Sequence, residues 1–427
     1  MSSILAPRLR RSLAVLASAA AVVVSAANVL ADVEPADLGD GLILMDAHAM
    51  AASRERARVD PTSAEGQAVA ALVRRAEQAL DKPITTVVNK PKAPSSGDMR
   101  DYVSLSPYWW PNPDTEDGLP YVRRDGEVNP ERDLYDLPAL DTMTVSVRDL
   151  ALAAFYAGDE RFAENAAERL RVWFLDEEKR MNPRMLFGQF VPGVSEGRKF
   201  GIIETNRLRW TPDAVAIVHA AGAITDEELA GIKDWFDHYK TWLMTSDFGT
   251  GELAGKNNHG TWCAAQIALY ASFAGDEATV VDMCEGVKER IAYQYEPDGS
   301  QPEELVRTRA LEYSDFNNRA MLELAHVGSA VGVDLWSFET EDGRSLRKGI
   351  DFITPYMVDF DAWTYKQTRT PRYDRFAAGL RRASVGFNDP ELERVIGQLP
   401  LDDRADLWLH LVLPLPADSF AAGMSDR

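Results

Sequence analysis

The tetrapeptide Ala-Gly-Asp-Glu occurs twice in this sequence, at 157–160 and 274–277, each time between two segments with apolar residues at helical spacing. Glycine favours the left-handed conformation that ends a helix, and aspartate is a preferred cap for the next one. A related turn, 222–227, joins the expected helices 211–221 and 226–244. A chain that repeats this unit is expected to fold as stacked helical pairs.

Apolar residues recur at helical spacing elsewhere, and strand-like alternation is scarce. We therefore expect an all-α chain, with residues 32–427 forming one large domain. The favoured architecture is an α/α toroid, an incomplete barrel of helical hairpins, and an open helical solenoid is the alternative. Further helices are expected around 145–156, 162–174, 260–273, 278–293, 309–331, 342–358, 374–383 and 404–413.

The N-terminal segment has the features of a secretory signal peptide. Arg8, Arg10 and Arg11 precede an Ala/Val-rich apolar run over 13–27, and small residues suited to cleavage follow. This run is shorter than the roughly 20 apolar residues that a membrane span needs. We expect a signal peptide over 1–31, a periplasmic or secreted protein, and no membrane span in the mature chain.

The charge and cysteine content exclude several classes of partner. Lys plus Arg total 46 and Asp plus Glu total 67, so the net charge is −21, and it becomes −24 without residues 1–31. Nucleic-acid binding requires a basic surface and is not expected. Cys263 and Cys284 allow at most one disulfide, and we interpret them as small buried hydrophobic residues. Without paired His or Cys/His spacing, neither a metal site nor a cofactor is expected.

Three segments do not fit the helical pattern. The first, 101–131, is rich in proline and glycine, and long loops of this kind in compact domains are usually functional. Flat aromatic rings suit sugar binding, although the same rings could instead close one end of a helical ring. The aromatic residues of this segment are Tyr102, Tyr108, Trp109, Trp110 and Tyr121.

The second and third segments, 255–262 and 298–318, carry polar residues at the starts of expected helices. Their chemistry suits β-elimination in a chain of acidic sugars, which requires a neutralised carboxylate, a base and an acid. Asn258 and His259 can hydrogen-bond a carboxylate and stabilise the developing enolate. Tyr313 can act as acid and base, with its pKa lowered by nearby cations.

These residues also carry a family resemblance. Asn257-Asn-His-Gly-Thr-Trp262 resembles the Asn-Asn-His-x-x-Trp signature of the alginate lyase superfamily, which includes polysaccharide lyase family 5. Arg307-Thr-Arg-Ala-Leu-Glu-Tyr313 resembles a second segment of that superfamily. The Tyr-Trp-Trp-Pro loop, followed by Asn129-Pro-Glu, is more similar to polysaccharide lyase family 38.

The resemblance implies an α/α toroid that cleaves alginate or β-1,4-glucuronan. It implies that Asn258 and His259 neutralise the substrate carboxylate, that Tyr313 is base and acid, and that Arg307 assists. In family 5 the arginine lies seven residues before the tyrosine, a position held here by Val306, so Arg307 and Arg309 remain alternatives. The expected substrate-binding residues are Tyr108, Trp109, Trp110, Tyr121, Arg207, Asn257, Trp262 and Arg309.

The leading hypothesis is thus a polyuronate lyase whose partner is an acidic polysaccharide. Local basic residues must offset the acidic net charge of the chain. One alternative is a toroidal glycoside hydrolase that uses two carboxylates, and another is a carbohydrate-binding protein without catalysis. The candidate basic residues are Arg123, Arg124, Lys199, Arg207, Arg209, Lys256, Arg307 and Arg309, and the candidate hydrolase carboxylates are Asp298, Glu303, Glu304 and Glu312.

Overall fold

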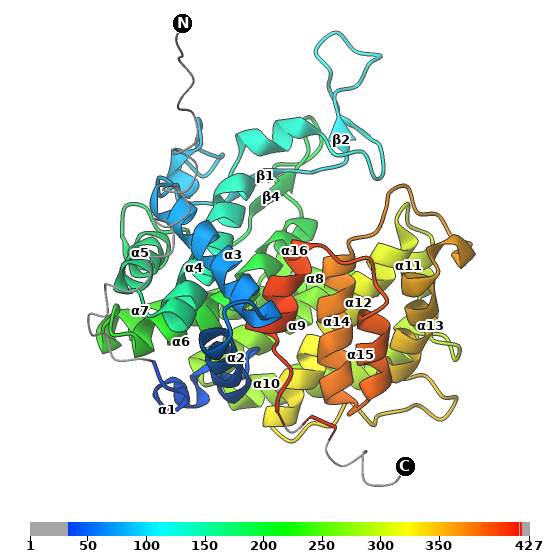
Figure 1. Ribbon diagram of the computed structural model, residues 1–427. Coiled ribbons are helices and arrows are strands. Elements are labelled where there is room, and N and C mark those ends of the chain that lie inside the picture. Colours follow the sequence, from blue (N-terminus) through cyan, green and yellow to red (C-terminus); the bar gives the residue numbers. More distant parts are fainter. Residues whose placement is uncertain (1–32, 418, 421–427) are drawn as a thin grey trace, which may run out of the picture.

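The computed structural model describes residues 33–417, 419 and 420, and the expected signal peptide over 1–31 lies outside them. The described chain is mostly helical, which confirms the predicted all-α class (Figure 1). The helices are α1 (Pro35–Leu38), α2 (Ala47–Val59), α3 (Ala64–Leu80), α4 (Leu137–Ala157), α5 (Glu160–Leu170), α6 (Thr211–Ala220), α7 (Asp226–Thr245), α8 (Asp247–Leu253), α9 (Asn258–Ala274), α10 (Glu277–Gln294), α11 (Pro302–Leu305), α12 (Ala310–Ala330), α13 (Leu346–Val358), α14 (Tyr373–Gly386), α15 (Pro390–Ile396) and α16 (Asp403–Asp406).

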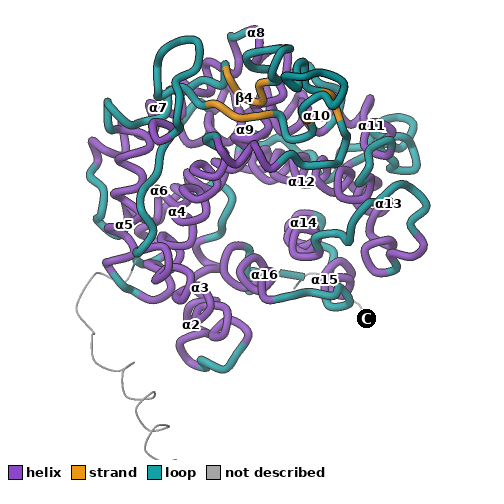
Figure 2. The backbone as a smooth tube through the Cα atoms, turned by 90° about the horizontal axis from the view of Figure 1, so that it is seen from above, coloured by secondary structure: helices purple, strands orange, loops and turns teal. Residues whose placement is uncertain are grey.

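The helices form a ring when the molecule is seen from above (Figure 2). Helices α4, α9, α12 and α14 lie toward the middle, and α5, α10 and α13 lie toward the outside. The inner helix α9 is buried on nearly all sides, because α7, α10 and α12 all pack against it. The first and last parts of the ring meet where α3 contacts α16 and the π-helical turn Leu407–Val412. The predicted α/α toroid is confirmed.

The predicted interhelical turns have the expected capping geometry. Gly158 ends α4 with φ 67°, and Asp159 then caps α5 by accepting a hydrogen bond from a backbone N–H. Gly275 ends α9 with φ 82°, and Asp276 caps α10 in the same way. In the third turn Thr225 forms a reciprocal capping box at the start of α7. These glycines supply the left-handed conformation at little steric cost.

Several expected helices differ from their predicted extents. The helix expected over 145–156 begins already at Leu137, and the one expected over 162–174 changes to a π-helical turn after Leu170. The helix expected over 342–358 begins only at Leu346, because a turn closed by Thr340 and Arg344 precedes it. The helix expected over 404–413 is the short α16, which continues as the π-helical turn Leu407–Val412. No helix among residues 33–417 is long and apolar enough to cross a membrane.

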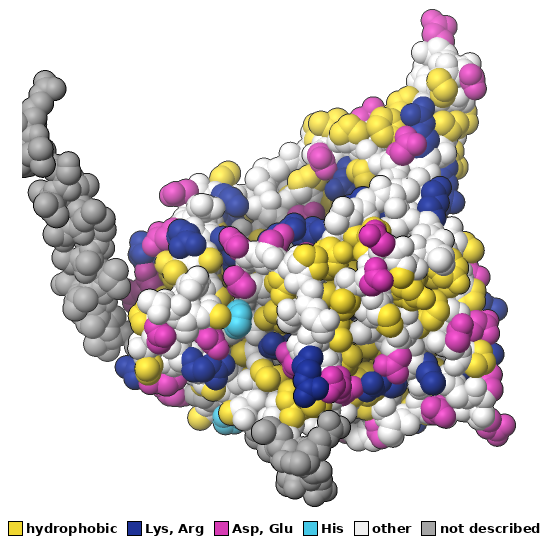
Figure 3. All heavy atoms as spheres, turned by 45° about the vertical axis from the view of Figure 1, so that its right-hand side comes forward, with side chains coloured by type: hydrophobic (Ala, Val, Ile, Leu, Met, Phe, Trp, Pro, Cys, Tyr) yellow, Lys and Arg dark blue, Asp and Glu magenta, His cyan; other side chains and the backbone are white. Residues whose placement is uncertain are grey.

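Within residues 33–417, four short strands accompany the helices. β1 (Val103–Leu105) pairs in parallel with β4 (Phe187–Phe190). β2 (Trp109–Trp110) pairs with β3 (Val122–Arg123) in an antiparallel hairpin. This hairpin projects from the body of the molecule (Figures 1 and 3). The predicted aromatic loop, 101–131, therefore projects from the helical ring, and we call it the arm.

The two cysteines lie inside the helical layers. Cys263 on α9 and Cys284 on α10 are both buried and free. Burial raises the pKa of the Cys284 thiol to about 12 and also raises that of Cys263. Their interpretation as small buried hydrophobic residues is confirmed, because neither thiol is accessible or bonded to the other.

A buried ion pair fixes the segment that leads into the aromatic arm. Lys90 Nζ lies 3.0 Å from a carboxylate oxygen of Asp136, and the two side chains are only 1% and 2% exposed. The same carboxylate accepts a hydrogen bond from Val103 N at 2.8 Å. Burial lowers the pKa of Lys90 and raises the pKa of Asp136 to about 7. The pair joins the residues before β1 to the start of α4.

Lys90→Met is expected to lower the free energy of unfolding by about 3 kcal/mol or more, because Asp136 stays buried without its cation. Urea denaturation followed by circular dichroism measures this change. The double variant Lys90→Met/Asp136→Asn leaves no unpaired charge and should recover much of the loss. A double variant as unstable as the single one would contradict this account of the ion pair.

Candidate active site

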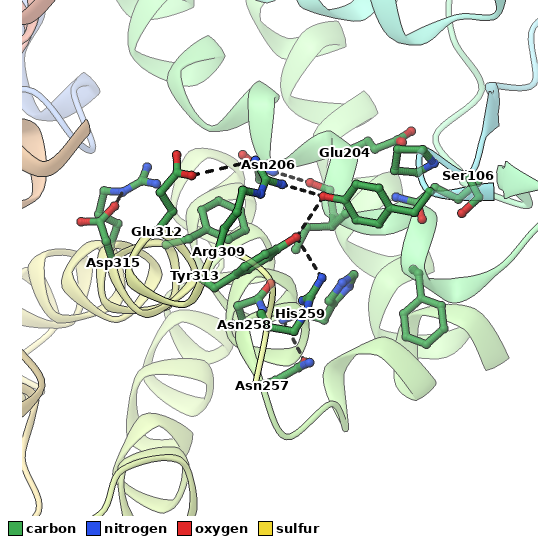
Figure 4. Close-up of a pocket in the computed structure, with 18 of the residues that line it drawn as sticks. Ser106, Glu204, Asn206, Asn257, Asn258, His259, Arg309, Glu312, Tyr313 and Asp315 are labelled. Carbon is green, nitrogen blue, oxygen red and sulfur yellow. Dashed lines mark hydrogen bonds and ion pairs between the residues drawn. The ribbon is translucent and has the colours of Figure 1, made fainter. Parts of the chain in front are cut away.

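The three segments singled out in the sequence meet at one cavity of about 530 Å³ (Figure 4). The aromatic arm supplies one wall, the first turn of α9 another, and the loop and first turn of α12 a third. Of the residues expected to act in catalysis or substrate binding, the cavity is lined by Tyr108, Trp109, Arg207, Asn257, Asn258, His259, Arg307, Arg309 and Tyr313.

Two phenols and two guanidinium groups form a network at the centre of the cavity. The hydroxyl groups of Tyr313 and Tyr108 lie 3.1 Å apart. Arg307 Nη2 donates to the Tyr313 hydroxyl at 2.9 Å, and Arg309 Nη2 donates to the Tyr108 hydroxyl at 2.6 Å. Each phenol is thus held by its own arginine, so both arginines that the sequence left as alternatives belong to the site.

Of the two arginines, Arg307 lies closer to Tyr313. Its guanidinium carbon lies 3.8 Å from the centre of the Tyr313 ring, compared with 5.5 Å for Arg309. Arg307 Nη2 also lies 3.5 Å from an oxygen of Asp125, which is carried by the arm. The arm therefore contacts both partners of the Arg307–Tyr313 pair, through Asp125 and through Tyr108.

The acidity of Tyr313 differs from the sequence expectation. Burial, reinforced by the neighbouring Tyr108, raises its pKa to about 12. Arg307 and Arg309 act in the opposite direction, as expected, but they do not outweigh burial. The phenol is therefore protonated at neutral pH in the absence of substrate, and the expected net lowering of its pKa is wrong.

Asn258 is the first residue of α9 and is held by a buried carboxylate. Its amide nitrogen lies 2.9 and 2.7 Å from the two oxygens of Glu304, and its backbone N–H donates to Glu304 at 2.7 Å. Burial raises the pKa of Glu304. Because the amide nitrogen faces Glu304, the expectation that it donates to a substrate carboxylate does not fit this orientation.

His259 is oriented by a carboxylate that sequence reasoning did not identify. Its Nδ1 lies 2.5 Å from Oε1 of Glu252, which is carried by α8 and is only 1% exposed. The imidazole ring also packs edge-on against Phe200 at 5.2 Å. Since Nδ1 faces Glu252, Nε2 is the nitrogen left for a ligand. Glu252 lies on a different helix from His259, so no periodicity in the sequence links them.

Three of the expected substrate-binding residues do not line the cavity. Trp262 is fully buried, and its indole N–H donates to the carbonyl of Phe316. The indole N–H of Trp110 donates to the carbonyl of Glu127 at 3.0 Å, and Tyr121 donates to Glu131 at 2.7 Å. The expectation that these three rings contact substrate is not supported by their positions. Trp262 instead packs in the core, and Trp110 and Tyr121 make contacts within the arm.

Three of the four carboxylates considered for a hydrolase are engaged in other contacts, and the fourth, Glu303, lines the cavity. Glu304 holds Asn258, and Glu312 receives two hydrogen bonds from Arg369, both at 2.9 Å. Asp298 accepts a hydrogen bond from the backbone of Ser300. Among the described residues, no three His, Cys, Asp or Glu side chains are grouped as a metal site.

Comparisons with known proteins agree with the helical fold. The family described as "Alginate lyase" matches residues 86–363. An alginate lyase from Bacteroides ovatus is 34% identical in sequence, with a TM-score of 0.83 over 87% of this chain and 99% of that chain. Alginate lyase A1-III from Sphingomonas species A1 shares the fold, with 15% identity and a TM-score of 0.50 over 90% of this chain and 97% of that chain.

A search of curated proteins finds no match. The family match spans well over half of the sequence, and the Bacteroides ovatus structure is similar over nearly its whole length. The chain therefore belongs to the alginate lyase family and is a polysaccharide lyase.

Proposed function

We propose that this protein is a metal-independent lyase that cleaves β-1,4-linked glucuronan and mannuronate-rich alginate by β-elimination. The observation that supports this proposal is the Tyr313 hydroxyl, which lies beside Arg307 in a cavity that His259 also lines. The alginate lyases to which the chain is similar support the substrate class. We further propose that residues 32–427 act as one exported domain, in the periplasm or outside the cell.

The first requirement of the reaction is to neutralise the carboxylate of the sugar that loses its proton. We assign this task to His259, held by Glu252, together with the positive charge of Arg307. Asn258 lies beside His259, but Glu304 holds its amide nitrogen, so we assign Asn258 the role of fixing the start of α9. Hydrogen bonds to the carboxylate strengthen as negative charge moves onto it, so they lower the barrier to removal of the C5 proton.

Tyr313 then transfers the proton. Its phenolate takes the proton from C5, a double bond forms between C4 and C5, and the bond from C4 to the bridging oxygen breaks. The phenol returns its proton to the departing oxygen. Arg307 stabilises the phenolate through the hydrogen bond that it donates. One group can perform both transfers because the C5 hydrogen and the C4 oxygen of these sugars lie on the same side.

Guluronate has the opposite configuration at C5, so base and acid must approach from opposite faces. The hydroxyl group of Tyr108 lies 3.1 Å from that of Tyr313 and hence on the same side of the cavity. The arrangement therefore favours mannuronate and glucuronate over guluronate. The six-residue spacing of Arg307 and Tyr313 and the Tyr-Trp-Trp-Pro loop favour glucuronan as the first choice.

The function is tested by initial rates on purified glucuronan, polymannuronate and polyguluronate, followed through the ultraviolet absorbance of the unsaturated product. We expect cleavage of the first two, poor cleavage of polyguluronate, and unchanged rates in the presence of a chelator. Saturated reducing ends without absorbance would indicate a hydrolase. Preference for polyguluronate would contradict transfer by one tyrosine, and loss of activity on chelation, restored by one divalent ion, would contradict metal independence.

Tyr313→Phe is expected to reduce kcat by at least about 10²–10⁴-fold while KM stays within about threefold, because the group that transfers the proton is removed. Tyr108→Phe is the matched control. It removes a neighbouring hydroxyl of the same kind, and a neutral hydrogen bond is worth about 1 kcal/mol, so its loss should not exceed about tenfold. Equal losses in the two variants would argue against a distinct role for Tyr313.

The pH dependence of kcat/KM tests the phenolate directly. Because the pKa of Tyr313 is raised to about 12, the ionised fraction is very small at pH 7 and rises about tenfold for each pH unit. We therefore expect kcat/KM to rise steadily between about pH 7 and pH 9, with circular dichroism confirming that the protein stays folded. A flat or falling profile would show that the Tyr313 phenolate is not the base.

A further inference from the structure

Gln189 on strand β4 has a strained backbone at the wall of the active-site cavity. Its φ angle is 49°, a left-handed conformation that side chains other than glycine rarely adopt. Residues 103–105 of β1 pair with residues 187–190 of β4, so β4 carries one extra residue there. Gln189 thus lies in a β-bulge, and it lines the cavity. Bulges beside active sites commonly redirect one side chain, and strained backbone persists where its surroundings enforce it.

Close contact between two backbone segments enforces this conformation. A Cβ atom on Gly197 would lie 1.9 Å from the carbonyl oxygen of Leu186, and one on Gly201 would lie 2.5 Å from the carbonyl carbon of Gly188. The backbone N–H of Arg198 donates to the carbonyl of Gly188 at 2.9 Å. Strand β4 and the segment 197–201 are therefore pressed together on both sides of the bulge.

The bulge provides Arg198 with two acceptors from one residue. Arg198 Nε donates to the backbone carbonyl of Gln189 at 3.1 Å, and Arg198 Nη2 donates to the side-chain Oε1 of Gln189 at 3.3 Å. Nη2 also donates to Oγ of Ser106 at 2.5 Å. The backbone and the amide of Gln189 thus fix the guanidinium group together.

Arg198 forms no ion pair with any carboxylate of the described residues. Burial lowers its pKa, and the attraction of Glu204 and Glu252 opposes this effect. Glu252 is engaged by His259, and Glu204 is hydrogen-bonded by Gln189. The neutral amide of Gln189 therefore contacts both Arg198 and Glu204, and it takes the place of a direct pair between them.

The guanidinium group of Arg198 lies near the aromatic rings on the His259 side of the cavity. Its central carbon lies 5.6 Å from the ring centre of Trp109 and 5.3 Å from that of Phe200, and the Phe200 ring packs against His259. All of these residues line the cavity. An anion that enters the cavity would supply the partner that this cation lacks, and its attraction is strengthened by partial burial.

We propose that Gln189 is a positioning residue, whose bulged backbone and neutral amide keep Arg198 apart from Glu204 and leave its charge for the uronate in the active-site cavity. This inference rests on the proposed function, because the anionic substrate is the missing partner. It follows that the strain in β4 serves activity, so relieving the strain should weaken substrate binding without lowering stability.

Gln189→Gly tests the role of the strain, because glycine adopts the left-handed conformation freely but carries no amide. The midpoint of its urea denaturation should be no lower than that of the wild type, while KM on polymannuronate should rise by about threefold or more. Asn388→Gly is the matched control. Asn388 has a φ of 52° in the turn between α14 and α15 and does not line the cavity, so KM and kcat should not change.

Two further variants show whether the effect passes through Arg198. Gln189→Glu keeps the shape of the side chain but gives Arg198 a permanent anionic partner, so KM should rise by about tenfold with kcat within about threefold. Arg198→Gln removes the cation and should raise KM to a similar extent. In the Arg198→Gln background, Gln189→Gly should not change KM further, because a residue that acts through another has no effect once that residue is absent.

Wild-type KM in Gln189→Gly would overturn the proposal, and so would an equal rise in KM with and without Arg198. A lower urea midpoint in Gln189→Gly would indicate a structural role and would overturn it as well. If Arg198→Gln does not fold, Gln189→Glu decides, since wild-type KM there would reject the role of Gln189. Cleavage rates of the wild type test the proposed function separately, so active wild-type enzyme with unaltered KM in these variants would reject only this inference.

Discussion

Helices α9 and α12 both begin at the wall of the active-site cavity. The positions of the catalytic side chains depend on where these two helices begin. The first turn of a helix has unpaired backbone N–H groups and a partial positive charge. Asn258 and His259 lie in the first turn of α9, and Tyr313 lies in that of α12. Polar side chains are therefore brought together at the helix ends while the rest of each helix packs in the core.

The same helices explain how an acidic protein can bind an acidic polymer. Arginines on the inner helices, such as Arg319 and Arg375, line the active-site cavity, where water screens their charge less than at the surface. Several are paired with carboxylates, such as Arg209 with Glu323 and Arg319 with Asp315. These pairs limit the cost of placing so many cations together, and the surplus positive charge remains for a substrate.

The sequence predicted best those features that depend on residues close together in the chain. The turns at Gly158 and Gly275 could be predicted because a left-handed glycine followed by an aspartate cap leaves a short signature. The grouping of the three polar segments could also be predicted, from the chemistry that they share. The partners Glu252 and Glu304 could not, because their contacts with His259 and Asn258 depend on how separate helices pack.

Trp262 shows that a sequence motif alone does not tell which of its residues face the cavity and which face the core. It follows Asn258 by four residues, and in a helix these two positions share one face. That face turns toward Phe316 on α12, so Trp262 belongs to the core while the neighbouring His259 reaches the cavity. The motif therefore combines residues that hold α9 in place with residues that face the cavity.

Tyr108 reaches Tyr313 from the projecting arm, whereas Tyr313 belongs to the helical ring. The groups around the hydroxyl of Tyr313, the proposed base, thus come from two parts of the protein, the helical ring and the arm. In an evolving family such an appendage can be exchanged without disturbing the helical core. A change in the arm would then alter the acidity of Tyr313 as well as the shape of the cavity wall, so substrate range and reaction rate would evolve together.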